Sequence, residues 1–434
     1  MAHYVLDQAR RTGIKSATSL GSRFLSTTSS VTTPPTSNVQ LRRVLILSKQ
    51  TRYETEVSNV GGVGVSQSPA GKQSLRREIS GRGLNYERLN HSYYSHVNSV
   101  NDLVTELDNR NIEYQVVTAT RDGVRDFPES YQHYDAVISA GGDGTFLKAA
   151  SEMYTSDVPL IGVNTDPNTS KGALCTIQSS LQFGRHLDQL AANDFDWQTH
   201  SRIRVQLETL ASYQQQQHDG SDDEDNNSVG SDGSDGSDGS DGSDGSGSAA
   251  PTSKWTQLKQ VALNEIFFAE RNVAHPIQHE IIVDEDQSSA DVQLSSGVLI
   301  CTGTGSSAWM ANAMSLDEHM VRRVLDMARD VVGELDTNKL DDHTVSVISE
   351  SLNRHTNFDI GSSDIQYFVR EVVNNGLRSP CRNRRGAHKS VTIRSRGWDP
   401  TMTLDGIHTY PLPAGQRAHF DTDPSVALRT CTFV

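Results

Sequence analysis

The chain has few long apolar runs, no paired cysteines and no excess of basic residues, and each shortage excludes a class of protein. Its longest unbroken apolar runs, such as Val44–Leu47, have four residues. A membrane-spanning helix needs about 20 apolar residues, so we expect no membrane partner. The 4 cysteines are far apart, which argues against a disulfide-stapled domain or a zinc cluster. The net charge of −15 argues against a nucleic-acid partner, because such proteins are usually basic.

Much of the acidity lies in one low-complexity stretch. Residues 219–244 hold ten acidic side chains and no Lys or Arg, and residues 231–245 repeat Ser-Asp-Gly. Such a segment has little to bury and repels itself, and it lacks the pattern of a calcium-binding loop. We therefore interpret residues 214–250 as a disordered surface insertion.

The first 40 residues differ from the rest of the chain. They carry Arg10, Arg11, Lys15 and Arg23 against the single acid Asp7, with 14 Ser or Thr. This basic, hydroxyl-rich composition is typical of an organellar transit peptide. An ordinary disordered tail is the alternative, and in either case residues 1–40 are set aside from the fold.

Residues 41–195 alternate between strand-like and helix-like patterns. Short apolar runs at 43–48, 112–117, 134–139 and 158–163 read as strands, and helical spacing appears at 89–107 and 145–154. This alternation predicts a Rossmann-like α/β domain with a parallel sheet. Residues 49–82 are polar and rich in Gly, which predicts a loop.

Residues 196–410 contain mainly β-like runs between polar turns, with the 214–250 insertion among them. This pattern predicts a second, mostly β, sandwich-like domain. The expected fold class is therefore α/β plus all-β.

A glycine-rich turn, Gly141–Thr145, separates a predicted strand from a predicted helix. Glycine lets the backbone approach a ligand closely, and a helix start favours phosphate. Asp143 stands among the glycines, where no bulky neighbour blocks it. The G-x-G-x-x-G fingerprint fails because Leu147 occupies its last position. A purely structural turn remains the alternative.

Three segments in this order resemble the NAD kinase family, mitochondrial branch, within the NAD kinase and lipid kinase superfamily. They are the Gly-Gly-Asp-Gly turn at 141–144, the Asn-Glu pair at 264–265, and the Gly/Thr-rich segment Ser296–Trp309. Supporting segments are Thr51–Glu54, Gly162–Pro167, Arg394–Asp399 and Leu404–Gly406. The resemblance covers about residues 41 to 434 outside the insertion.

The resemblance implies an NAD kinase-like fold and transfer of the ATP γ-phosphoryl group to the adenosine 2′-hydroxyl of NAD. It implies Asp143 as the general base, with Mg²⁺ arriving on ATP rather than in a dedicated metal site. The implied substrate and nucleotide contacts are Gly142, Gly144, Thr145, Asn164, Asn264, Glu265, Thr302, Thr304, Ser307, Ala308 and Trp309.

The resemblance also implies a homodimer in the mitochondrial matrix, with residues 411–434 returning to the first domain. Two other functions stay open at this point. One is a lipid kinase of the same superfamily, and the other is a catalytically silent NAD-binding sensor. Trp309 as a core residue, Asn264-Glu265 as a solvent-facing pair and residues 302–307 as a plain turn are the simpler structural alternatives.

Overall fold

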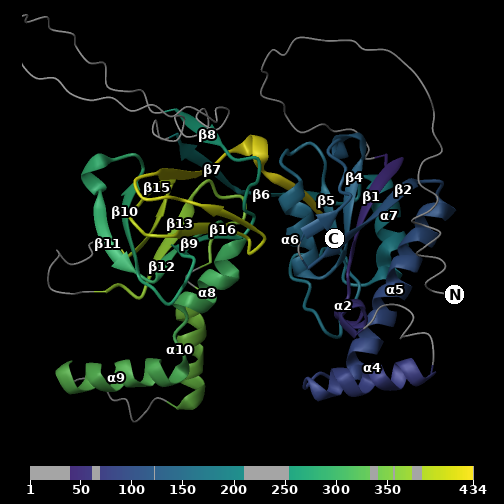
Figure 1. Cartoon of the computed structure of the whole chain (residues 1–434), viewed down its shortest axis with the longest axis horizontal. Helices are drawn as coiled ribbons and strands as arrows, with labels where there is room; N and C mark the ends of the chain where they lie inside the picture. Colours follow the sequence, from purple (N-terminus) through teal and green to yellow (C-terminus); the bar gives the residue numbers. More distant parts are fainter. Residues whose placement is uncertain are drawn as a thin grey trace, which may run out of the picture.

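The computed structural model describes residues 40–60, 69–121, 123–209, 254–332, 341–354, 357–373 and 384–433. The predicted transit peptide, apart from residue 40, and the predicted insertion at 214–250 lie outside these residues. Within them the chain forms two lobes that lie side by side in Figure 1, one α/β and one mostly β. The predicted fold class is therefore confirmed.

The first lobe is built on a five-stranded sheet with strand order β3-β2-β1-β4-β5. All its strand pairs are parallel except the pairing of β2 with the short edge strand β3. Its strands are β1 (Arg43–Lys49), β2 (Glu113–Thr120), β3 (Gly123–Arg125), β4 (Ala136–Gly141) and β5 (Leu160–Asn164).

Helices cover both faces of this sheet (Figure 1). The helices are α2 (Arg52–Val60), α4 (Pro69–Gly81), α5 (Tyr86–Asn109), α6 (Asp143–Glu152) and α7 (Phe183–Ala192). Leu103 of α5 and Phe183 of α7 pack on one face, whereas Phe146 of α6 packs on the other. The central strands are buried on both faces, which explains why their sequences read as short apolar runs rather than as alternating patterns.

The prediction of a loop over residues 49–82 is wrong, because α2 and α4 are helices. Their sequences are mostly polar, but Tyr53 and Val57 of α2 and Leu75 and Ile79 of α4 are buried in one small cluster against Tyr93 of α5 and its neighbours. Tertiary packing therefore stabilises helices that their average polarity did not indicate.

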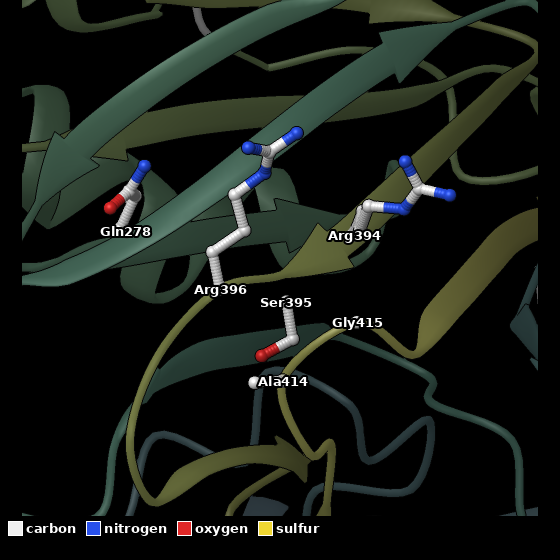
Figure 2. Close-up of a pocket in the computed structure, with 6 residues that line it drawn as sticks. All are labelled: Gln278, Arg394, Ser395, Arg396, Ala414 and Gly415. Atoms are coloured by element: carbon white, nitrogen blue, oxygen red, sulfur yellow. The ribbon is translucent and has the colours of Figure 1, made fainter. Parts of the chain in front are cut away.

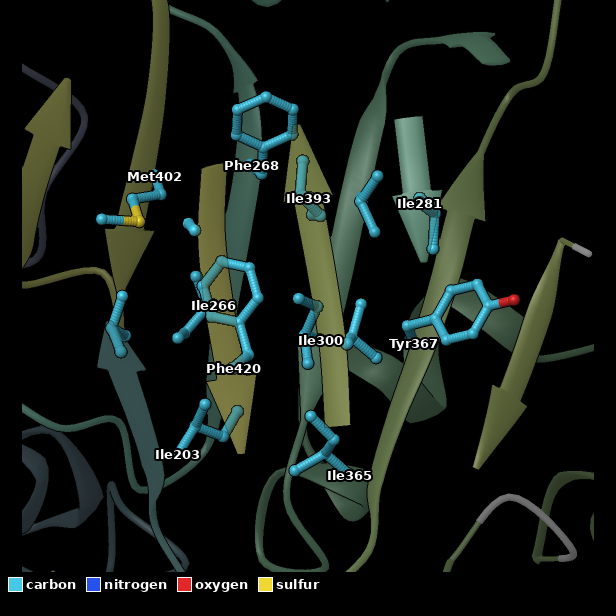
Figure 3. Close-up of a cluster of buried hydrophobic side chains, with 14 of the residues drawn as sticks. Ile203, Ile266, Phe268, Ile281, Ile300, Ile365, Tyr367, Ile393, Met402 and Phe420 are labelled. Atoms are coloured by element: carbon cyan, nitrogen blue, oxygen red, sulfur yellow. The ribbon is translucent and has the colours of Figure 1, made fainter. Parts of the chain in front are cut away.

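The second lobe is a sandwich of two six-stranded antiparallel sheets, ordered β11-β10-β15-β18-β7-β8 and β14-β13-β12-β9-β16-β17. Side chains from both sheets fill the space between them (Figure 3), including Phe268, Ile393 and Phe420. The strands of the first sheet are β7 (Ile203–Glu208), β8 (Trp255–Gln257), β10 (Ile277–Val283), β11 (Asp291–Ser295), β15 (Ser390–Ser395) and β18 (Arg417–Thr422). Those of the second are β9 (Glu265–Glu270), β12 (Gly297–Cys301), β13 (Ile365–Arg370), β14 (Arg385–His388), β16 (Pro400–Leu404) and β17 (His408–Pro411).

In the described residues between β12 and β13 the α-helices are α8 (Trp309–Met314), α9 (Glu318–Val332) and α10 (Asp342–Arg354). In Figure 1, α9 and α10 project from the sandwich, away from its strands.

A separate two-stranded pairing joins β6 (Asp196–His200) to β19 (Leu428–Thr432). Leu428 and Cys431 of β19 are buried in the two cores of the first lobe. The chain therefore crosses to the sandwich after β6, and β19 lies again against the first lobe.

Candidate active site

The glycine-rich turn joins β4 to α6, and its glycines differ in what surrounds them. A Cβ on Gly141 would lie 2.2 Å from Thr145 Oγ1, and one on Gly142 would lie 2.4 Å from Ser170 Oγ. A Cβ on Gly144 would meet nothing within 4 Å. Packing against Thr145 thus requires Gly141, a Cβ on Gly142 would displace the Ser170 hydroxyl, and Gly144 borders open space.

Asp143 is the first residue of α6 and is only partly buried. Its Oδ1 accepts the backbone N–H of Leu174 at 2.8 Å. Among the described residues no group hydrogen-bonds to its Oδ2. One carboxylate oxygen is therefore fixed, and the other is left for a ligand.

Asn164 ends β5, next to the turn, and its side chain is turned toward its own loop. Its Nδ2 donates to the carbonyl of Ser170 at 3.0 Å, and its Oδ1 accepts the N–H of Asp166 at 3.1 Å. Asn164 thus holds in place the loop whose Ser170 lies against Gly142. Direct contact of Asn164 with a nucleotide stays a prediction.

Two charged side chains that were not among the predicted site residues lie beside this turn. Lys49 ends β1, and burial lowers its pKa, while Asp166 and Glu54 partly offset that effect. Asp166 is fully buried, and its Oδ2 accepts the hydroxyl of Ser92 at 2.5 Å. Because Lys49 stands two positions after the apolar run Val44–Leu47, its place at the carboxyl edge of a parallel sheet was a usable signal.

The second group of predicted residues begins at the start of β9, in the other lobe. The Asp405 carboxylate accepts three backbone N–H groups, from Leu263 at 2.7 Å, Asn264 at 2.8 Å and Glu265 at 3.0 Å. Asn264 is buried, and its Oδ1 has no partner among the described residues. The structure thus fixes the backbone of this pair and leaves a side-chain acceptor of Asn264 unused.

Glu265 and Asp405 form a pair of carboxyl groups with shifted ionisation. Burial, and then the charge of Asp405, raise the pKa of Glu265 to about 7. Burial also raises the pKa of Asp405 to about 6, against the opposing effect of its three N–H donors and of Arg202. Near neutral pH, Glu265 therefore exists in both protonation states and can donate as well as accept a hydrogen bond.

The Gly/Thr-rich segment Ser296–Trp309 lies against the backbone of Leu263 and Asn264. Thr302 Oγ1 donates to the carbonyl of Leu263 at 2.6 Å, and Thr304 Oγ1 lies 2.9 Å from His200 Nδ1. A Cβ on Gly303 would lie 2.0 Å from the carbonyl oxygen of Asp359, and one on Gly305 would lie 2.0 Å from that of Asn264. Both glycines are therefore needed for this chain segment to pass so close to its neighbours.

Ser307, Ala308 and Trp309 follow at the start of α8. Ser307 is exposed, and its hydroxyl donates to the carbonyl of Thr304 at 3.2 Å. Trp309 is 38% exposed and lies against Phe267, with ring centroids 4.9 Å apart. Trp309 is therefore a partly exposed ring that packs on Phe267, and it is not a core residue.

The glycine-rich turn at 141–145 and the group around Asn264 and Glu265 are connected through buried neighbouring residues. The described contacts do not join the predicted site residues of the two groups directly. Leu263 packs in the same core as Phe146 of α6. The fully buried Arg202 donates to the carbonyl of Ala150 in α6 at 2.9 Å and to that of Val426 at 2.5 Å. These contacts hold the helix that bears Asp143 against the lobe that bears Asn264. Nothing in the sequence around Arg202 indicated this role.

The segment Arg394–Asp399, which supports the resemblance, contributes Arg394 and Arg396 to a separate hollow. Figure 2 shows a hollow of the sandwich lined by Gln278, Arg394, Ser395, Arg396, Ala414 and Gly415. Arg396 Nη2 lies 3.2 Å from Glu280 Oε2 and Arg394 Nη1 lies 3.5 Å from it. None of these residues belongs to the predicted site, and the two guanidinium groups are paired with a carboxylate.

In the described part of the chain no helix is both long and apolar enough to cross a membrane. Nor do any three or more of its His, Cys, Asp and Glu side chains form a group that could hold a metal ion.

Residues 85–195 match the family model of the ATP-NAD kinase N-terminal domain. The protein named "NAD kinase 2, mitochondrial" of Rattus norvegicus is 30% identical over 391 residues, which is 89% of this chain and 87% of the rat protein. Its Homo sapiens counterpart is 30% identical over 391 residues, 89% of this chain and 83% of the human protein. That of Xenopus tropicalis is 29% identical over 407 residues, 89% of this chain and 90% of the frog protein.

Proposed function

Since this chain belongs to the NAD kinase family, we propose that it transfers the γ-phosphoryl group of ATP to the adenosine 2′-hydroxyl of NAD, with Asp143 as general base. The observation that carries the proposal is the state of Asp143 itself. One of its oxygens is tied to Leu174, and the other has no partner among the described residues. That arrangement orients a proton acceptor beside the start of a helix.

The reaction breaks the bond between the γ-phosphorus of ATP and the bridging oxygen, and forms a bond to the ribose oxygen. ADP leaves, and the hydroxyl proton goes to Asp143. Transfer of this kind depends mainly on positioning and on stabilising charge. The free N–H groups at the start of α6 suit the phosphates. Gly142 and Gly144 have no Cβ, so a phosphate can approach the backbone there. Mg²⁺ enters with ATP as part of the substrate.

We assign NAD to the group of residues around Asn264 and Glu265. Asn264 and Glu265 hold the ribose or the adenine through a free amide oxygen and a carboxyl group of pKa about 7. We also assign contacts with the substrates to Thr302, Thr304, Ser307, Ala308 and Trp309 in this lobe and to Thr145 and Asn164 in the other. The exposed ring of Trp309, supported by Phe267, suits stacking against a flat base.

We further propose that the protein works in the mitochondrial matrix as a homodimer. The basic, Ser/Thr-rich first 40 residues and the mitochondrial names of the rat and human relatives support this location. Fluorescence of a fusion of residues 1–40 to a reporter, followed by protease protection in mitoplasts, tests it. A reporter that the protease digests in mitoplasts with intact inner membranes would contradict the matrix assignment.

The decisive experiment is an enzyme-coupled assay for NADP and NADPH, run with NAD or NADH as acceptor and with ATP or polyphosphate as donor. We expect NADP from NAD, or NADPH from NADH, only when a phosphoryl donor, Mg²⁺ and wild-type protein are all present. Labelled lipid in place of NADP would identify a lipid kinase instead. Tight NAD binding without turnover would identify a sensor.

A further inference from the structure

His200 is a buried histidine that the proposed reaction does not use. It is the last residue of β6 and is 7% exposed. Its Nδ1 lies 2.9 Å from the hydroxyl oxygen of Thr304, which is 104 positions away in the sequence and is also buried. This contact therefore connects the end of β6 with the Gly/Thr-rich segment of the candidate site.

The Thr304 hydroxyl has hydrogen-bonding capacity left for a ligand. Among the described residues, His200 is its one hydrogen-bond partner. A hydroxyl has one donor and two acceptor sites, so two of the three are unused. The next residue is Gly305, where a Cβ would lie 2.0 Å from the carbonyl oxygen of Asn264. Thr304 therefore stands beside the Asn-Glu pair with its hydroxyl only partly used.

The ring of His200 controls how the Thr304 hydroxyl is oriented. Burial lowers the pKa of His200 to about 4, so the ring is uncharged near neutral pH, with one nitrogen that donates and one that accepts. If Nδ1 accepts, the hydroxyl keeps its lone pairs for a ligand, and if Nδ1 donates, the hydroxyl keeps its hydrogen. In both cases the rotation of the hydroxyl is fixed by the histidine.

The backbone of His200 is tied to the first lobe. Strand β6 pairs with β19, where His200 stands opposite Leu428, and Leu428 is buried in a core of that lobe. Figure 1 shows β6 between the two lobes. The hydrogen bond to Thr304 therefore joins a predicted substrate contact of the second lobe to the strand pair that packs on the lobe of Asp143.

We propose that His200 is a positioning residue for NAD, which acts by holding the Thr304 hydroxyl in one orientation toward the dinucleotide. This inference rests on the proposed function and narrows the assignment of Thr304 to NAD. Loss of the histidine should weaken NAD binding, because the hydroxyl then rotates freely and must be ordered by the substrate. ATP binding and proton transfer to Asp143 do not involve Thr304, so they should change little.

Two substitutions separate the hydrogen bond from the bulk of the ring. His200→Ala removes both, whereas the uncharged amide of His200→Asn can take the place of Nδ1. In His200→Ala we expect the KM for NAD to rise about fivefold, the effect of about one hydrogen bond, while kcat and the KM for ATP stay within about twofold of wild type. In His200→Asn the KM for NAD should return to within about twofold of wild type. A merely structural defect would reduce the active fraction, and hence kcat, and would leave KM unchanged.

The sandwich contains a matched control for this contact. His419 Nδ1 lies 2.9 Å from Thr392 Oγ1, and neither residue is among the predicted site residues. His419→Ala removes the same kind of histidine–threonine hydrogen bond. We expect its KM for NAD to equal the wild-type value.

Combination with Thr304→Val tests whether His200 acts through Thr304. Valine has nearly the shape of threonine but no hydroxyl. In the Thr304→Val protein, His200→Ala should raise the KM for NAD by less than about twofold, because the two changes remove the same interaction. A further fivefold rise in the double variant, an unchanged KM in His200→Ala, or a KM in His200→Asn as high as in His200→Ala would each overturn the positioning role.

Calorimetry with NAD separates this inference from the proposed function. If the wild type binds NAD but makes no NADP, the kinase assignment fails. The positioning role then stands if His200→Ala raises the Kd for NAD about fivefold and His200→Asn restores it. If the wild type makes NADP and His200→Ala changes neither KM nor Kd for NAD, the kinase stands and the positioning role fails. A wild-type protein that does not bind NAD would refute both.

Discussion

The Asp405 carboxylate accepts the backbone N–H of Asn264 at 2.8 Å, although the two residues are 141 positions apart. The same carboxylate also accepts the N–H groups of Leu263 and Glu265. Asp405 has φ of 49°, a conformation that Asp and Asn tolerate better than most residues. Asp405 is therefore a positioning residue, which acts on the dinucleotide only through the Asn-Glu pair.

Replacing Asp405 tests this role. Asp405→Ala removes the acceptor of three N–H groups, and we expect the free energy of unfolding to fall by about 3 kcal/mol. Asp405→Asn keeps one oxygen and should lose less. In Asp405→Asn we also expect a higher KM for NAD with a smaller change in kcat, together with a lower pKa of Glu265, because the neighbouring negative charge is gone.

Asp399→Asn provides the control for Asp405, because Asp399 is exposed and its side chain pairs with Arg271. Its free energy of unfolding should stay within about 0.5 kcal/mol of the wild-type value. A KM for NAD that is equal in Asp405→Asn and wild type would contradict the positioning role.

The raised pKa of Glu265 predicts a pH-dependent stability. A carboxyl group with a folded-state pKa of about 7 favours folding most at low pH, and that contribution is lost as the pH rises through about 7. Glu265→Gln cannot ionise, so its Tm relative to wild type should rise between pH 5 and pH 8. The difference in unfolding free energy should reach at most about 3 kcal/mol. Thermal unfolding at the two pH values measures it, and a constant difference would contradict the assigned pKa.

Two glycine substitutions distinguish a glycine that packing requires, Gly305, from a glycine that a ligand is expected to approach, Gly144. Gly305→Ala would place Cβ 2.0 Å from the carbonyl oxygen of Asn264, and we expect a stability loss of about 3 kcal/mol or more. Gly144→Ala meets nothing within 4 Å and lies in the first turn of α6, so the fold should keep or slightly gain stability. If phosphate approaches this backbone, Gly144→Ala should still raise the KM for ATP. Unchanged kinetics in a stable Gly144→Ala protein would argue against the phosphate site.

Asp143→Asn tests the chemistry directly. An Asn oxygen can still accept the N–H of Leu174, so the local structure should survive, but the amide cannot take a proton. We expect kcat to fall by about 10²–10⁴-fold, while the Kd for NAD measured by calorimetry stays nearly unchanged. Turnover within a few-fold of wild type would remove Asp143 from the role of general base.

The sequence predicted those parts of the fold that depend on local patterns. The apolar strands β1, β4 and β5 and the turn that carries Asp143 were predicted because burial and glycine chemistry leave local signals. Helices α2 and α4 were missed because their few apolar residues become meaningful only when α5 packs on them.

The parts of the site that depend on distant contacts could not be predicted in the same way. Arg202, Lys49 and the action of Asp405 on Asn264 each depend on a partner far away in the sequence. Asn164 shows the opposite case. Its motif marked a ligand contact, whereas its side-chain bonds here hold the loop that carries Ser170.

The pairing of β6 with β19 has a consequence for biosynthesis. Asp196 and Thr432 are 236 positions apart, and Leu428 and Cys431 complete the two cores of the first lobe. A ribosome must therefore make the whole sandwich before those cores can close. Until then the nascent α/β half exposes apolar surface, so a chaperone that shields it during translation or after import would raise the yield of folded protein.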